Sequence, residues 1–221
     1  MSGVVSQANP LRARRDEEKL QRRNEILDAA EAVIRKHGWE NTDFGKIAKV
    51  ARLSRSLLYT YFATRDHLFH AICDRGLEML EARFIKALAT HSKGLDQVMA
   101  MGHAYWDFSK KSAFYFELLS QFQTKSWNPE EHLAEEENAN LHGRGCLRML
   151  AQAIATGIAD ASIRKSIGEP GPASFTIWAF THGVIQIATQ KEYLVQEDLG
   201  MNSGQMIEHS LQLLRTALAA E

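Results

Sequence analysis

The residues of this chain best suited to binding chemistry stand together in one short segment, residues 54–62. If the segment is helical, Leu58 and Phe62 lie four residues apart on one apolar face. The polar side chains are then on the opposite face, namely Arg55, Ser56, Tyr59 and Thr60. Such a helix fits the major groove of DNA, where arginine binds guanine and serine or threonine pairs with several base edges. Tyrosine hydroxyls, and a basic side chain such as Arg65 at the next helix start, suit phosphates.

A second interpretation gives this segment no partner. Tyr59 and Tyr61 would be partly buried aromatics with solvated hydroxyls, and the arginines would be ordinary surface charge. The charge distribution favours DNA instead, although the formal net charge is only −1. Residues 1–65 hold 13 Lys and Arg against 8 Asp and Glu, whereas residues 66–221 hold 13 against 19. This split predicts that the N-terminal part meets a polyanion and the remainder does not.

Helical patterns surround the segment. Apolar residues recur at three- and four-residue steps, which predicts helices over about 18–37, 43–50, 54–61 and 65–90. The residues suited to the N-caps of the last three are Thr42, Ser54 and Thr64. Gly38 suits the left-handed turn that ends the first helix. Two short helices joined by a tight turn form a helix-turn-helix.

Over residues 22–68 the chain resembles the DNA-binding domain of TetR-type bacterial transcriptional regulators. The resemblance runs through Ile26-Leu27-Asp28-Ala29-Ala30, Gly38-Trp39, Thr42, Ile47-Ala48, Ala51, Ser54, Leu58-Tyr59, Tyr61-Phe62, Arg65-Asp66 and Leu68. The spacing from Thr42 to Leu68 needs no gap. The resemblance implies an all-α fold with an N-terminal three-helix DNA-binding domain and a C-terminal helical domain for ligand binding and dimerisation.

The resemblance also implies roles for single residues. Thr42 would touch a phosphate at the start of the second helix, and Tyr59, Tyr61 and Arg65 would hold the DNA backbone. The recognition helix would carry Ser54, Arg55, Ser56 and Thr60.

Four residues depart from the family pattern. Arg52 stands in the turn where glycine is usual, so it either adopts a left-handed conformation at some strain or adds a phosphate contact. Ser56 also replaces a frequent glycine and changes which base edges can be read. Arg65-Asp66 replaces Lys-Glu and keeps both charges.

The rest of the chain is predicted to be helical as well. Prolines stand only at 10, 129, 170 and 172, which leaves long stretches free of helix breakers. The expected helices are near 95–110, 113–124, 130–158, 172–191 and 203–219, with a loop from Ile163 to Pro172.

Two of these helices carry the apolar faces expected at a dimer interface. The helix over 172–191 is apolar nearly all round, and a helix of that kind must be buried on two sides. Two helices from each of two chains would close a symmetric four-helix interface. The residues assigned to it are Phe175, Val184, Ile207, Leu211, Leu214 and Leu218. The alternative is that these side chains form the core of a monomer.

An aromatic-rich stretch over residues 105–127 indicates either a core or a ligand pocket, because both are lined by such rings. As a pocket, it would take a mostly apolar or aromatic ligand between the helices over 95–124, 130–158 and 172–190. The residues assigned to it are His103, Trp106, Phe122, Gln123, Trp178 and His182.

Catalysis, metals and cofactors are not expected. His132, Glu136 and His142 suggest a metal site, but no paired ligand motif accompanies them, and no nucleophile, base and orienting group stand together. Cys73 and Cys146 form neither a metal spacing nor a disulfide framework, which favours a reducing cytoplasm. No secretory signal or transmembrane stretch is expected.

The sequence therefore predicts three regions: a flexible basic tail at 1–17, a DNA-binding domain at 18–65 and a regulatory and dimerisation domain at 66–221. The predicted function is that of a cytoplasmic homodimeric repressor that binds a palindromic operator in double-stranded DNA and is released by a small effector. The alternative is an all-α ligand-binding protein or enzyme whose helical corner is only structural.

Overall fold

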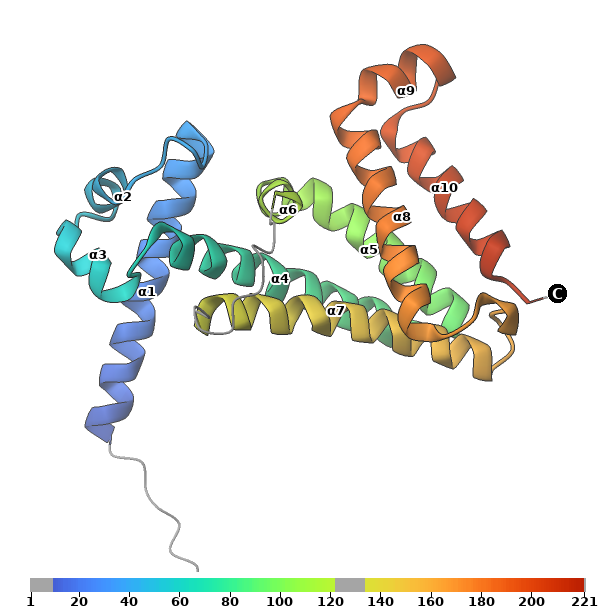
Figure 1. The fold of residues 1–221 in the computed structure, drawn as a ribbon, viewed down its shortest axis with the longest axis horizontal. Coiled ribbons are helices and arrows are strands. Elements are labelled where there is room, and N and C mark those ends of the chain that lie inside the picture. The colour runs from blue at the N-terminus through green and yellow to red at the C-terminus, as the bar shows by residue number, and fades with distance from the viewer. Residues whose placement is uncertain (1–9, 122–133, 221) are drawn as a thin grey trace, which may run out of the picture. The chain divides into compact units, whose positions relative to one another are not determined.

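The computed structural model describes residues 10–121 and 134–220, and within these ranges the chain forms ten α-helices (Figure 1). The same ranges also contain one short 3-10 helix and an isolated bridge between Ile163 and Ala219. The predicted all-α fold is confirmed. The chain divides into two compact units, Met1–Ile72 and Cys73–Glu221.

The first unit is a three-helix domain that includes the start of a fourth helix. Its elements are α1 (Pro10–His37), α2 (Phe44–Ala51), α3 (Arg55–Tyr61) and the first two turns of α4 (Arg65–Ala89). The side chains at its centre are at most 1% exposed: Ile26, Leu27, Ile47, Leu58, Phe62 and Leu68. Each such side chain contributes about 1.5–3 kcal/mol of burial energy, so these six positions hold the short helices in place.

The boundaries of these helices follow local chemistry. Gly38 has the left-handed backbone (φ 76°) expected after α1. The Ser54 hydroxyl accepts a hydrogen bond from the Leu57 amide at 3.2 Å, so the predicted N-cap of α3 is confirmed. The predicted cap of α2 is wrong by one residue. Asp43 caps that helix by accepting from the Lys46 amide at 3.0 Å, because the preceding Thr42 is turned inward.

The first helix begins earlier than the sequence pattern indicated. It starts at Pro10, so residues 10–17 are helical where a flexible tail was expected; residues 1–9 lie outside the described residues. Proline is well suited to a first helical position, and an exposed pair between Arg14 and Glu18 (3.0 Å) supports the next turn. The apolar pattern missed these turns because they bury nothing.

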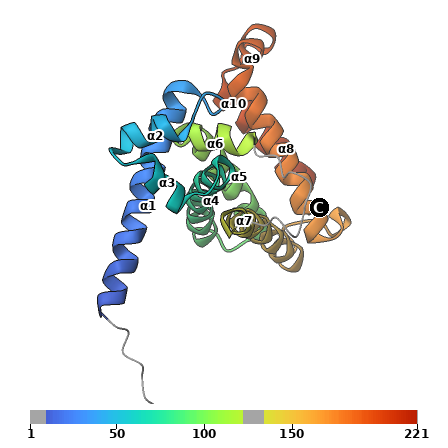
Figure 2. The ribbon, with the colours of Figure 1, turned by 60° about the vertical axis from the view of Figure 1, so that its left-hand side comes forward.

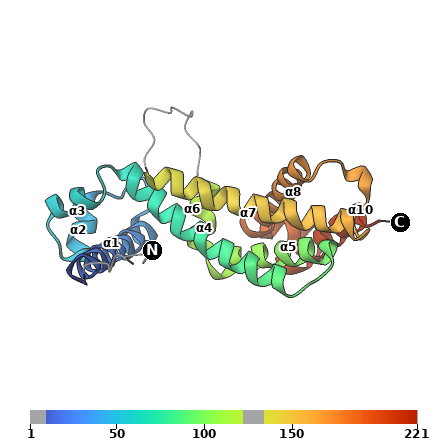
Figure 3. The same ribbon diagram turned by 90° about the horizontal axis from the view of Figure 1, so that it is seen from below.

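The second unit is a helical bundle formed by the rest of α4 and six further helices. These are α5 (Gly94–Lys111), α6 (Ala113–Ser120), α7 (Ala134–Ala159), α8 (Pro170–Gln190), α9 (Glu192–Leu199) and α10 (Ser203–Leu218). Helix α7 runs alongside α4 and α5 (Figure 3). Helix α8 packs on α7, and α10 lies beside α8 and α5 (Figure 2).

Three boundaries in this unit differ from the prediction. Helix α6 ends at Ser120, four residues early. Helix α8 starts at Pro170, inside the predicted loop, because proline is accepted at the first position of a helix. Residues 192–199, which had no predicted element, form α9 and end at Gly200 with a left-handed backbone (φ 64°).

Glycines allow α5 and α7 to approach each other closely. A Cβ atom on Gly94 would lie 2.0 Å from the backbone nitrogen of Gly157, so only glycine fits there. The Asp160 carboxylate accepts a hydrogen bond from the Gly94 amide at 2.8 Å and so caps α5. Hydrogen bonds from Ser162 and Gly94 hold the pKa of Asp160 below its usual value.

Helix α4 is tied to α7 by a polar cluster. His142 Nδ1 lies 2.5 Å from a carboxylate oxygen of Glu81, and His142 Nε2 lies 3.7 Å from Asp74. These contacts join the second unit to the same helix that starts in the first unit. Among the described residues, no three or more His, Cys, Asp or Glu side chains are arranged to hold a metal ion. No helix of the described ranges is both long and apolar enough to span a membrane.

Candidate nucleic-acid interface

The candidate interface is built on α3, which is anchored by one inward side chain. Leu58 is 1% exposed and packs in the core of the first unit. The polar residues of the helix are exposed as predicted, namely Ser54, Arg55, Ser56, Tyr59 and Thr60. Because Leu58 holds the apolar face of α3 against the core, the polar face of the helix points outward.

Arg55 and Tyr59 form a preorganised pair on that face. An Nη atom of Arg55 donates to the Tyr59 hydroxyl at 3.2 Å, and its guanidinium lies 5.7 Å from the centre of the tyrosine ring. The Tyr59 ring in turn packs on Phe44 of α2, with ring centres 4.8 Å apart. Tyr59 thus has its ring on the protein and, at 46% exposure, its hydroxyl within reach of a ligand.

Tyr61 is the last residue of α3, and Arg65 is the first residue of α4. Arg65 is exposed, stacks over the Trp39 ring at 4.7 Å and donates to the Trp39 carbonyl at 2.8 Å. Its planar guanidinium has five donors, so donors remain for a phosphate. Tyr61 is half-buried.

Arg52 has the left-handed conformation that the departure from glycine suggested, with φ 56° and ψ 41°. Its backbone amide donates to the Ala48 carbonyl and closes α2, while its side chain is exposed beside the start of α3. The strain therefore belongs to the turn between the two helices that a helix-turn-helix places on DNA.

Thr42 is not brought to this surface. It is 2% exposed, and its hydroxyl donates to the Gly38 carbonyl at 2.8 Å. This side chain stabilises the loop before α2 and does not face outward, which corrects the expectation of a phosphate contact. Sequence reasoning also missed Lys49, an exposed cation on α2. Its position directly after the buried pair Ile47 and Ala48 was the available signal.

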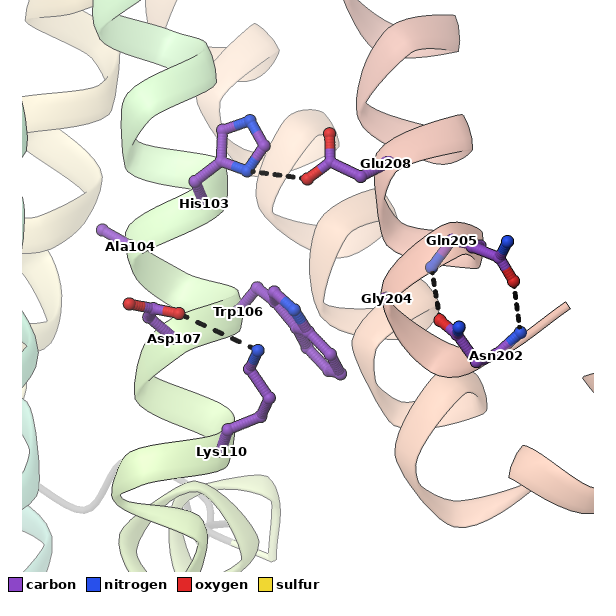
Figure 4. Close-up of a pocket in the computed structure, with 9 residues that line it drawn as sticks. All are labelled: His103, Ala104, Trp106, Asp107, Lys110, Asn202, Gly204, Gln205 and Glu208. Atoms are coloured by element: carbon purple, nitrogen blue, oxygen red, sulfur yellow. Dashed lines mark hydrogen bonds and ion pairs between the residues drawn. The ribbon is translucent and has the colours of Figure 1, made fainter.

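The residues assigned to a ligand pocket lie in two different places of the second unit. His103 and Trp106 line an open cleft of about 730 Å³ between α5 and α10 (Figure 4). In this cleft His103 Nδ1 lies 3.4 Å from a Glu208 carboxylate oxygen, and the Lys110 ammonium sits 4.7 Å above the Trp106 ring. Charged and polar side chains therefore line the cleft beside the Trp106 ring.

Trp178 and His182 lie instead in an aromatic cluster with Tyr105 of α5 and Phe116 of α6. The Tyr105 hydroxyl and His182 Nδ1 form a hydrogen bond of 2.7 Å. The His182 ring has its centre 5.3 Å from that of Phe116 and 6.1 Å from that of Trp178. Burial raises the pKa of Tyr105 and lowers that of His182, so both are neutral near pH 7. Phe122 and Gln123 lie outside the described residues.

The residues assigned to a dimer interface also divide. Phe175 is 56% exposed, and Val184 and Leu214 are half-buried. Ile207, Leu211 and Leu218 are only 2–4% exposed and face the interior of their own chain, which corrects their assignment to a free surface. They are buried because α10 turns this stripe onto α5 and α8.

Other apolar side chains form the exposed face of these helices. Together with Phe175, the large apolar side chains exposed on α8, α9 and α10 are Trp178, Phe180, Ile187, Tyr193, Leu194, Leu199 and Leu213. An apolar groove of about 480 Å³ runs between α8 and α10, lined by Thr176, Phe180, Leu213, Leu214 and Ala217 among others. The sequence pattern identified the two helices α8 and α10, but it assigned the buried leucines of α10 to the surface and missed the exposed Leu213.

Comparison with protein families gives one match in the first unit. The model described as "Bacterial regulatory proteins, tetR family" matches residues 26–72, which contain α2, α3 and the buried part of α1.

Two curated proteins are similar over longer stretches. The nicotine-responsive transcriptional repressor HdnoR of Paenarthrobacter nicotinovorans is 26% identical over 110 residues, which cover 49% of this chain and 55% of that protein. The transcriptional activator FasR of Mycolicibacterium smegmatis is 28% identical over 99 residues, 45% of each chain. The matched region thus spans about half the length of these relatives.

Similarity of fold extends over most of the chain. The transcriptional regulator FadR from Bacillus subtilis, solved in complex with stearoyl-CoA, superimposes with a TM-score of 0.67 over 87% of this chain and 97% of that chain. The sequences are 16% identical, so this likeness concerns the fold alone.

Proposed function

Since this chain belongs to the tetR family of bacterial regulatory proteins, we propose that it is a repressor that binds a palindromic operator as a homodimer and is released by a small, mostly apolar effector. Membership in this family favours a regulator over the alternative of an enzyme with a structural helical corner. The relatives include one repressor and one activator, so the direction of regulation is part of the proposal.

The observation that carries the DNA-binding part is the exposed face of α3. Arg55 is paired with Tyr59 on that face, and its remaining donors match the two acceptors of guanine in the major groove. Ser56 and Thr60 are exposed on the same helix and suit contacts to other base edges. Lys49, Arg52 and Arg65 surround the helix with cations suited to phosphates.

The homodimer is supported by the exposed apolar face of α8 and α10. Phe180, Leu213 and the groove between the two helices leave apolar surface in contact with water, which a second copy would cover. A two-fold axis through this face makes the interface self-complementary. The same symmetry gives two recognition helices, which bind adjacent half-sites when they are about 34–36 Å apart.

The effector site that fits best is the cluster of Tyr105, Phe116, Trp178 and His182. Its side chains are aromatic and pack on one another, and the hydrogen-bonded pair Tyr105 and His182 would fix the orientation of a mostly apolar ligand that inserts among them. HdnoR responds to nicotine and FadR was solved in complex with stearoyl-CoA, and both ligands carry apolar carbon. The cleft lined by His103 and Trp106 is the second candidate.

Release requires that the effector prefer a conformation that does not bind DNA, because a ligand with equal affinity for both states shifts nothing. Helix α4 offers a physical connection. It begins beside the recognition helix at Arg65 and is held to α7 through Glu81 and His142. A movement of α7 would displace α4 and so change the distance between the two recognition helices of the dimer.

Selection of duplexes from a random-sequence pool by the full-length protein tests this function. We expect a palindrome to be enriched. Arg55→Ala should then weaken binding to it by about 1–3 kcal/mol and relax the preference at one base pair. Tyr59→Phe should also weaken binding, because it removes a backbone contact and the hydroxyl that holds Arg55.

Arg144→Ala serves as the control, since Arg144 is an exposed arginine of the second unit. Enrichment of no sequence, or equal binding by the wild type and Arg55→Ala, would contradict the proposal and favour a structural role for the helical corner.

A further inference from the structure

The N-terminal part of α1 carries a row of cations that the proposed recognition helix does not use. Arg12, Arg15, Lys19 and Arg23 follow one another at three- and four-residue steps, so they share one face of the helix. We refer to these four residues as the basic stripe. The same spacing continues through Ile26 and Ala30, which are fully buried against the rest of the first unit. The basic stripe is therefore on the side of α1 that faces the DNA-binding helices.

One contact confirms this direction. The Arg23 guanidinium lies 5.3 Å from the centre of the Phe62 ring, and Phe62 is the residue that ends α3. From Arg23 toward its N-terminus, α1 continues past α2 and α3 (Figures 1 and 2), and residues 11–22 are all exposed. Two acidic residues of this segment pair away from the stripe, Glu18 with Arg14 and Glu25 with Arg22. Asp16 lies on the face of the stripe itself, four residues after Arg12 and three before Lys19, so the four cations and Asp16 together leave that face with a net charge of +3.

The stripe disfavours the helix in the isolated protein. Three pairs of like charges stand three or four residues apart and repel each other, and Asp16 offsets that repulsion only in part. A helical segment whose side chains are exposed is also marginal in water. A polyanion would remove that repulsion. From Arg12 to Arg23 the stripe is about 16 Å long at 1.5 Å per residue, which matches roughly five base pairs of duplex at 3.4 Å per pair.

We propose that the basic stripe of α1 binds the phosphate backbone of the DNA that flanks each half-site. This inference rests on the proposed function and extends the interface beyond the recognition helix. The contact is made to the outside of the duplex, because a helix of about 10–12 Å diameter does not enter a minor groove about 6 Å wide. It therefore adds affinity and salt dependence without adding sequence preference.

The test compares two duplexes that contain the same selected palindrome, one trimmed to that sequence and one with ten further base pairs of arbitrary sequence on each side. The full-length wild type is compared with the variant Arg12→Gln/Arg15→Gln/Lys19→Gln over a range of salt concentrations. Glutamine removes the charge and keeps helix propensity. We expect the variant to bind the long duplex about 10- to 100-fold more weakly at low salt, and its salt slope to fall by up to about 2.7 per protomer.

On the trimmed duplex, the variant and the wild type should bind equally. Two controls accompany the stripe variant, one matched to its change in charge and one to its helix. Lys86→Gln/Lys165→Gln/Lys191→Gln removes three exposed charges from the second unit, and Arg14→Gln removes one from the opposite side of α1. Both controls should bind the long duplex within about twofold of the wild type, because neither alters the basic stripe.

Three results would overturn the inference: an unchanged affinity of the stripe variant for the long duplex, an equal loss on both duplexes, or an equal loss in the charge-matched control. A loss of binding to anionic phospholipid vesicles with no loss on the long duplex would assign the stripe to a membrane surface and also overturn it. If the wild type selects no palindrome and binds neither duplex, the proposed function itself fails, which is a separate outcome.

Discussion

The two units of this protein differ in how well an apolar side chain predicts burial. In the first unit the large side chains that meet between the helices, such as Ile26, Leu58 and Phe62, form one core, and the polar face of α3 is left outside. In the second unit α8 and α10 carry apolar side chains on buried and exposed sides alike, such as Leu211 at 4% and Leu213 at 55% exposure. A stripe of apolar residues thus identifies the core in the first unit but does not distinguish core from interface in the second.

The largest effects are expected on α10, where substitution of a buried leucine should lower stability and substitution of an exposed one should weaken the dimer. Leu211→Ala should lower the free energy of unfolding by about 3 kcal/mol, because it opens a cavity beside Gly102. Leu213→Asp should leave the fold of each protomer intact and weaken the dimer by at least about tenfold, since it places a charge in the apolar face. Urea unfolding and sedimentation velocity measure the two quantities. A dimer unaffected by Leu213→Asp would mean that the interface lies elsewhere.

A somewhat smaller effect is expected where α5 meets α7. Gly94→Ala places a methyl group against the backbone of Gly157 and should lower the free energy of unfolding by about 2–3 kcal/mol. The second unit should become less stable while the first unit keeps its helices. Gly171→Ala is the matched control, because nothing lies within 4 Å of the added atom there. Thermal unfolding followed by circular dichroism gives both values, and equal effects would refute the close approach of the two helices.

In the first unit, a substitution in the turn before α3 should raise the free energy of unfolding rather than lower it. Arg52→Gly relieves a left-handed backbone and should raise the free energy of unfolding by about 1 kcal/mol. Lys49→Gly, three residues earlier inside α2, should lower it by about 1 kcal/mol. The same unfolding experiment compares the two variants. Destabilisation by Arg52→Gly would show that the arginine side chain contributes more to the fold than its backbone strain removes.

The smallest effect concerns pH and the aromatic cluster. Burial lowers the pKa of His182 below its ordinary value of 6.5, so the unfolded chain binds this proton more readily than the folded one. The contribution of His182 to stability should therefore be constant above about pH 7 and decrease as the pH falls below 6.5. His182→Gln should flatten that part of the profile, whereas His209→Gln, at an exposed position, should not. Unfolding midpoints between pH 5 and 8 check this, and identical profiles for all three proteins would contradict it.

Much of the first unit could be predicted because its signals are local. The cap at Ser54, the left-handed Gly38 and the inward Leu58 each follow from one residue and its near neighbours. The two errors there also have local causes. The adjacent Asp43, rather than Thr42, caps α2. The first turns of α1 have no apolar pattern because their side chains are exposed.

The residues proposed for ligand binding were harder to predict, because they depend on distant contacts. His103 and His182 are both on helices that line possible pockets, but one faces Glu208 of α10 and the other faces Tyr105 of α5. Neither partner is near its histidine in the chain. Tyr105 was visible only as one of many aromatic residues, and its pairing with His182 depends on how α8 packs in the bundle.

Composition, helical periodicity and capping residues are properties of the chain itself, and they were enough to establish the all-α fold, the position of α3 and the direction in which its polar face points. The packing of α10 decided which of its leucines are buried and which are left for a partner, because both sides of that helix are apolar. Packing also decided that the cations of α1 form a straight, exposed stripe beside α3, since it is the burial of Ile26 and Ala30 that sets the rotation of that helix.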